Sequence, residues 1–185
     1  MDIDNIWIFK NFSMGHELDI AGEFIYESAK RMMGIQSFHN EFEINSILYN
    51  GAVGIERLQK ILLCLYCIEK EDDLSHPIKC LLEHNHNDLQ SKIQDYINCG
   101  FNGNHNCLLD VFRDYYNDYR YGNYMINRKS DIINLLERVF KRKNKKLNAD
   151  ELLCLYDIEE YIQFFINLLG QIARTYYNLI SARAC

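Results

Sequence analysis

Apolar residues recur at intervals of three and four along most of the chain, which is the spacing of a helix with one buried face. Leu18, Ala21, Ile25 and Met32 follow this spacing with charged residues between them. They predict an amphipathic helix over residues 16–33. The same spacing returns in later segments, so the pattern predicts a protein built from helices.

A second, longer repeat predicts a helix from about Asn40 to Glu69. Asn40 and Glu43 have the spacing of a capping box, with asparagine in the place of serine or threonine. Gly51 and Gly54 lie in the middle of this helix, where each glycine costs about 1 kcal/mol relative to alanine. We therefore expect close helix packing or a kink at these glycines.

The second half of the chain predicts further helices, separated by polar joints. Pro77 suits the first turn of one helix, and Cys99-Gly100 has the composition of a left-handed cap at its end. The last helix is predicted to start at an Asn148 N-cap and to continue to Ile180, a length of roughly 50 Å at 1.5 Å per residue. Other predicted helices cover Leu108 to Tyr116 and the residues from about Ser130 to Phe140.

Composition narrows the fold class. The chain has 185 residues, 48% of them hydrophobic, which is enough to bury one core. One proline and nine glycines are too few for the many tight turns of a sandwich or barrel. The sequence therefore predicts one all-α domain over residues 1–185, a bundle of about five to six helices with a long C-terminal helix.

Three features predict a cytoplasmic protein without a membrane anchor. The seven cysteines are odd in number and follow no disulfide framework, which favours reduced thiols. The first residues lack the charge and apolar pattern of a signal peptide. The apolar stretch Tyr161 to Tyr177 is interrupted by polar residues and is too short to span a bilayer.

Charge is distributed unevenly along the chain. Residues Arg113 to Lys146 contain ten Lys and Arg against four acidic residues, a local charge of +6. The rest of the chain carries −12, and the whole chain carries −6. A basic segment on an acidic body is typical of a localised phosphate-binding surface. Alternatively, the run Lys141 to Lys146 simply closes a helix, where cations meet the negative end of the dipole.

The basic segment also holds five of the thirteen tyrosines, all between residues 115 and 124, with Arg120 among them. Aromatic rings and a guanidinium group stack on unpaired bases, so these residues are candidates for RNA binding. Packing of a tyrosine-rich helix end under a loop is the alternative. The candidate nucleic-acid-binding residues are Arg113, Asn117, Tyr119, Tyr121, Asn123, Arg128, Lys129, Lys141, Arg142 and Lys143.

Several of these features together resemble the HEPN superfamily of prokaryotic defence and toxin–antitoxin proteins. They are the all-helical pattern, the long helix around Gly54 to Leu58, the junction His84 to Leu89 and Arg120 before another helix. The resemblance implies a HEPN-like bundle, a homodimer, and binding of RNA or an RNA-containing complex. The signature of that family, an arginine followed after four to six residues by a histidine, is missing: Arg31 comes nearest, with His39 eight positions later.

The resemblance also implies a metal-independent ribonuclease that needs no cofactor. Such cleavage requires a base, a cation and an acid. Arg120 is the candidate cation, and Tyr124, His84 and His86 are the candidates for proton transfer. The alternative function is a non-catalytic interaction module, a small subunit or inhibitor that docks on a larger defence protein. The missing histidine of the signature, the acidic body and the long final helix, with more apolar face than one chain is expected to cover, favour it.

Other constellations point to structural roles. Glu56 and Lys60 have the favoured i,i+4 spacing and predict a salt bridge on the helix surface. Cys64 and Cys67 have the spacing of a redox motif, but they lie in an apolar helix and are expected to be buried thiols. The histidines at positions 84 and 86 lack the usual ligand spacing of a zinc site, so no metal is expected.

Overall fold

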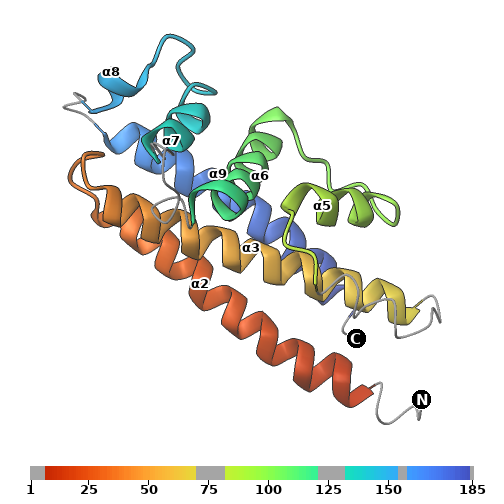
Figure 1. Ribbon diagram of the computed structural model, residues 1–185. Helices are drawn as coiled ribbons and strands as arrows, with labels where there is room; N and C mark the ends of the chain where they lie inside the picture. Colours follow the sequence, from red (N-terminus) through yellow and green to blue (C-terminus); the bar gives the residue numbers. More distant parts are fainter. Residues whose placement is uncertain (1–6, 70–81, 121–131, 154–157, 184–185) are drawn as a thin grey trace.

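The computed structural model describes residues 7–69, 82–120, 132–153 and 158–183, and these residues form an all-α bundle (Figure 1). The longest helices are α2 (Met14–Gly34), α3 (Glu41–Glu69) and α9 (Glu159–Ser181). Shorter helices are α5 (His86–Gln94), α6 (Gly103–Asp114), α7 (Ile133–Phe140) and α8 (Ala149–Leu153). Single π-helical turns precede α2 and follow α6, as η1 (Phe9–Ser13) and η2 (Tyr115–Tyr119). The predicted fold class is confirmed.

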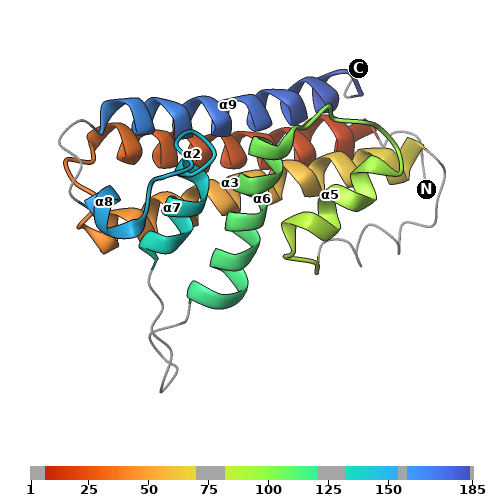
Figure 2. The ribbon, with the colours of Figure 1, turned by 90° about the horizontal axis from the view of Figure 1, so that it is seen from above.

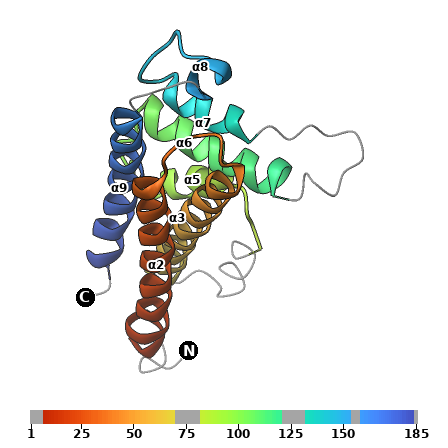
Figure 3. The ribbon, with the colours of Figure 1, turned by 90° about the vertical axis from the view of Figure 1, so that its left-hand side faces the viewer.

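Helix α3 is the centre of the bundle. Helices α2 and α9 run beside it, while α5 and α6 pack across its other side, and α7 packs against α6 and α9 (Figures 2 and 3). Among its fully buried side chains are Ile44, Leu48, Ile55 and Leu62. A helix buried on several faces must carry apolar residues around most of its circumference. This explains why the repeat over residues 41–69 is denser than that of α2.

The two glycines of α3 lie where neighbouring helices come closest. A Cβ atom at Gly54 would lie 2.6 Å from Cγ1 of Ile25 on α2. A Cβ atom at Gly51 would lie 2.8 Å from Cζ of Phe112 on α6. Both distances are shorter than atoms tolerate, so the close packing expected from the sequence is confirmed at these positions.

Asparagine side chains begin several of the helices. Asn85 accepts from the backbone N–H of Asn87 at the start of α5, and Asn102 forms a reciprocal capping box with His105 at the start of α6. Asn148 and Glu151 make the same reciprocal pair before α8, with N···O distances of 2.8 and 3.1 Å. These bonds satisfy N–H groups that have no partner within the helix.

The last helix differs from the prediction. One continuous helix from Asn148 was expected, but the described residues form two helices, α8 ending at Leu153 and α9 starting at Glu159. Leu152 and Ile162 are both buried. The apolar repeat therefore continues through the break, and periodicity alone does not reveal the change of direction that packs α8 against α7.

The end of α5 also differs from the prediction. The helix ends at Gln94, five positions before the expected cap at Cys99-Gly100. Gly100 does have a left-handed backbone, with φ of 67°, but it shapes the loop before α6 instead of closing a helix. The predicted helix start at Pro77 lies outside the described residues.

No helix among the described residues is both long and apolar enough to cross a bilayer. Cys64 and Cys67 are buried in α3, as expected.

Candidate functional site

The candidate site begins with an ion pair buried on α3. Lys60 Nζ lies 2.7 Å from Glu56 Oε1, and the two side chains are only 13% and 10% exposed. The predicted salt bridge is therefore confirmed, but its predicted place on the surface is wrong. Met14 and Phe24 of α2, together with His84 and Tyr116, lie around this part of the helix. Desolvation offsets much of the attraction within such a pair, so the pair is weak evidence for a purely stabilising role.

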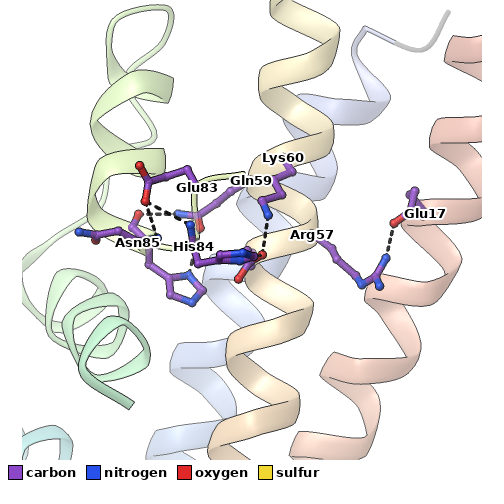
Figure 4. A network of polar contacts seen from close by, with 9 residues as sticks. Glu17, Arg57, Gln59, Lys60, Glu83, His84 and Asn85 are labelled. Atoms are coloured by element: carbon purple, nitrogen blue, oxygen red, sulfur yellow. Dashed lines mark hydrogen bonds and ion pairs between the residues drawn. The ribbon is translucent and has the colours of Figure 1, made fainter. Parts of the chain in front are cut away.

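His84 shares the same carboxylate oxygen. Its Nδ1 lies 3.0 Å from Glu56 Oε1, and its side chain is 52% exposed (Figure 4). A carboxylate only accepts hydrogen bonds, so Nδ1 carries the proton and Nε2 of the neutral ring keeps its lone pair. Glu56 therefore sets the tautomer of a histidine that solvent reaches.

The backbone before α5 holds His84 in place. Glu83 Oε1 accepts from the backbone N–H groups of His84 and Asn85, at 3.1 and 3.0 Å. The next histidine, His86, is fully buried, and its Nδ1 lies 3.0 Å from Gln59 Oε1 on α3. This buried ring ties the start of α5 to α3, close in sequence to His84.

A tyrosine ring joins His84 to Arg120. The His84 and Tyr116 rings stack with centroids 5.4 Å apart and planes 17° from parallel. The Arg120 guanidinium carbon lies 4.6 Å from the Tyr116 centroid and 5.4 Å from that of Tyr49 on α3. The structure thus brings together two of the candidates for catalysis, Arg120 and His84.

Burial raises the pKa of Tyr116, and the nearby Glu56 carboxylate raises it further, while Arg120 opposes both. A raised pKa keeps the phenol protonated at neutral pH, so the hydroxyl remains a proton donor. Glu56 itself has a second buried oxygen, Oε2, for which no described residue supplies a hydrogen bond. The carboxylate therefore retains accepting capacity beyond its bonds to Lys60 and His84.

A groove lies over α3 beside this cluster. Its volume is about 540 Å³, within the usual range of small-molecule sites. One wall is formed by η1 and α2, and the other by His84 and Tyr116. Glu56 and Lys60 lie in its floor.

The other proton-transfer candidates do not join the cluster. Burial is the main cause that lowers the pKa of His86 to about 4, so this ring is neutral at physiological pH. Its Nδ1 is bonded in the core to Gln59, and we leave His86 out of the candidate site. Tyr124 lies outside the described residues.

The candidate nucleic-acid residues fall into separate places. Arg113 pairs with Asp110 and Asp114 at 3.0 and 2.7 Å, and these carboxylates raise its pKa. Asn117 is exposed on η2, whereas Tyr119 is half-buried and packs against the core. The candidates Tyr121, Asn123, Arg128 and Lys129 lie outside the described residues.

Lys141, Arg142 and Lys143 form the turn after α7. Lys141 pairs with Glu137, and Lys143 pairs with Glu160 at 2.5 Å. Arg142 Nε donates to Asn104 Oδ1 at the start of α6. Arg120 follows the other end of α6 and η2, so roughly 25 Å of helix separates this basic turn from the His84 cluster.

Sequence reasoning missed the roles of Glu56, Lys60, Tyr116 and Tyr49 in this cluster. The available signal was a pair of opposite charges inside an otherwise apolar stretch of α3. Chemically, the cluster combines an oriented imidazole, two cations and a protonated phenol beside a groove. Comparison with protein-family models, curated proteins and solved structures finds no match for this chain.

Proposed function

We propose that the protein binds single-stranded RNA and cleaves it without a metal ion, at the cluster of Glu56, Lys60, His84, Tyr116 and Arg120. One observation carries the proposal: a buried carboxylate is shared between a partly buried lysine and an exposed histidine. A purely structural salt bridge does not need the histidine, and a histidine on the surface does not need a buried carboxylate. An oriented general base needs both.

The proposed reaction is a transesterification within the RNA. His84 Nε2 takes the proton of a 2′-hydroxyl, whose oxygen attacks the adjacent phosphorus as the bond to the 5′-oxygen breaks. The Tyr116 hydroxyl gives its proton to the departing oxygen, and water exchange then returns the proton from His84 to Tyr116. The products are a 2′,3′-cyclic phosphate and a 5′-hydroxyl.

Charge stabilisation in this scheme comes from Lys60 and Arg120. The negative charge that develops on the phosphorane oxygens needs cations already in position. Lys60 is held by Glu56, and Arg120 is held over the rings of Tyr116 and Tyr49. Side chains ordered in this way lose little further freedom when the transition state forms.

The test is RNA cleavage in the presence of a chelator. Wild-type protein is incubated with a labelled single-stranded RNA in EDTA, and the products are examined for cyclic phosphate ends. We expect His84→Ala to lower the rate by about 10²–10⁴-fold, the usual size of a general-base contribution. His39→Ala is the matched control, because this histidine is exposed on the turn between α2 and α3. Equal rates for the two variants would refute the role of His84.

The biological setting follows from the HEPN resemblance alone. We propose a role in prokaryotic defence or in a toxin–antitoxin pair, with the protein acting as a cytoplasmic homodimer on RNA or an RNA-containing complex. Sedimentation velocity of the purified chain, with and without RNA, measures both associations. A monomer that does not shift with RNA would contradict this assignment.

A second candidate function is an interaction module that docks on a larger defence protein. The specific observation is an exposed apolar group before α2, where Trp7, Ile8 and Phe12 are 58%, 49% and 64% exposed. Large apolar side chains exposed together often mark protein interfaces. Trp7→Ser with Phe12→Ser would then abolish co-purification of the partner. Retained co-purification by this variant, or RNA cleavage by the purified chain as a monomer, would refute this function.

A further inference from the structure

The groove beside the His84 cluster has aromatic and apolar walls, of which the cleavage scheme uses only Tyr49 and Tyr116. Phe24 of α2 and Tyr49 of α3 form an edge-to-face pair with centroids 6.5 Å apart, and both line the groove. Val53 and Met14 add apolar surface to the groove. Flat aromatic surfaces of this kind accept the face of an unpaired nucleobase.

One end of the groove carries a second charged pair. The Arg57 guanidinium is paired with the Glu17 carboxylate across the gap between α3 and α2. Its carbon also lies 5.7 Å from the Phe24 ring centroid. Both charged side chains are partly exposed, at 34% and 39%, so a ligand in the groove reaches them.

The two charged groups lie on opposite sides of α3. Figure 4 shows Arg57 and Glu17 on the side facing α2, and His84 and Glu83 on the side facing α5. The groove is lined by residues of both groups. A ligand that occupies it therefore meets the aromatic walls and the Arg57–Glu17 pair at one end and the reactive cluster at the other.

We propose that this groove binds an unpaired guanine, so that the protein selects the guanine next to the phosphate it cleaves. Only the cleavage step of this proposal depends on the proposed function; guanine binding does not. Arg57 donates to guanine O6, and the Glu17 carboxylate accepts from N1–H and N2–H. The Watson–Crick edge of guanine offers two adjacent donors to the carboxylate. Adenine and cytosine offer one donor each there, and the single donor of uracil is flanked by acceptors.

This arrangement also excludes double-stranded RNA. A base pair already uses the edge that Arg57 and Glu17 would bind, and stacking hides the face that Phe24 and Tyr49 would contact. Proteins that recognise an RNA sequence accordingly form hydrogen bonds with the Watson–Crick edges of unpaired bases. The substrate class is therefore single-stranded RNA with an accessible guanine.

The test measures binding of the four nucleoside 3′-monophosphates to the full-length protein by calorimetry. Guanosine 3′-monophosphate is expected to bind about tenfold or more tightly than the other three, the smaller end of what a bidentate base contact provides. Glu17→Gln removes the charged acceptor at a partly exposed position, and we expect it to bring the four affinities within about threefold of one another. Glu23→Gln is the matched control on the exposed side of α2 and should retain the preference.

Equal affinity for all four nucleotides, no binding of any of them, or a guanine preference that survives Glu17→Gln would overturn the proposal. Cleavage of a single-stranded RNA with one guanine separates this inference from the proposed function. Cleavage spread evenly over all positions refutes the guanine groove and leaves the ribonuclease intact. Guanine-selective binding without any cleavage supports the groove and refutes the ribonuclease.

Discussion

A single methyl group at Gly54 tests how tightly α3 packs on α2. In Gly54→Ala the new Cβ would lie 2.6 Å from Ile25 Cγ1 and 3.1 Å from the backbone oxygen of Ala21. The isoleucine side chain has some freedom to rotate, but the backbone oxygen moves only if the two helices separate. Overpacking of this kind costs about 1–3 kcal/mol. Alanine regains about 1 kcal/mol of helix propensity, so we expect a net loss of up to about 2 kcal/mol.

Urea unfolding followed by circular dichroism measures this loss. Gly170→Ala is the matched control, because it adds the same methyl group inside α9, where no described atom outside the helix's own neighbouring backbone lies within 4 Å of the new Cβ. Only the propensity gain applies there, so we expect this variant to be more stable than wild type by about 0.5–1 kcal/mol. If Gly54→Ala is stabilised to the same extent, the packing described for α2 and α3 is wrong.

Two more predictions concern the buried hydrogen-bond network between α3, α5 and α9. Burial lowers the pKa of His86 from 6.5 to about 4, so at acidic pH the unfolded chain protonates this ring more readily than the folded chain does. The free energy of unfolding should therefore fall by up to about 3 kcal/mol as the pH drops from 6.5 to about 4. Urea unfolding at several pH values should show a weaker pH dependence of the free energy of unfolding for His86→Gln. An unchanged pH dependence would contradict the role of His86. Tyr176→Phe removes a hydroxyl bonded to the buried amides of Gln59 and Gln90, for an expected loss of about 2–3 kcal/mol. Tyr177→Phe, at an exposed position, should change stability by less than about 0.5 kcal/mol; equal losses would exclude the network.

The helices were predictable because each one buries a face that the sequence repeats locally. The spacing of Leu18 to Met32 predicted α2 within two residues at its start and one at its end. The glycines of α3 predicted close packing, since a helix tolerates them at a cost that closer packing offsets. The break before α9 was not predictable, because Leu152 and Ile162 keep the apolar spacing on both sides of it.

The candidate site was only partly predictable, because its parts are distant in the sequence. Glu56 meets a histidine 28 positions later, and that histidine stacks on the ring of Tyr116. Local spacing predicted the pair of Glu56 with Lys60. The burial of this pair depends on residues distant in the sequence, such as His84 and Tyr116, which the spacing within α3 cannot predict. His84 and His86 look alike in the sequence; the structure separates them, with one half-exposed and the other in the core.

The central claim is that Glu56 acts on the reaction through His84, and a double-mutant cycle of RNA cleavage tests it most directly. The measurement is kcat/KM for wild type, Glu56→Gln, His84→Ala and the double variant, each with its helical circular dichroism verified. We expect Glu56→Gln alone to lose about 10²-fold or more, and the loss in the double variant to be much smaller than the product of the two single losses, because residues that act as one unit are not additive. A loss beyond that of His84→Ala measures what Glu56 contributes by holding Lys60. Full activity in a folded Glu56→Gln variant, or two losses that multiply in the double variant, would contradict the claim.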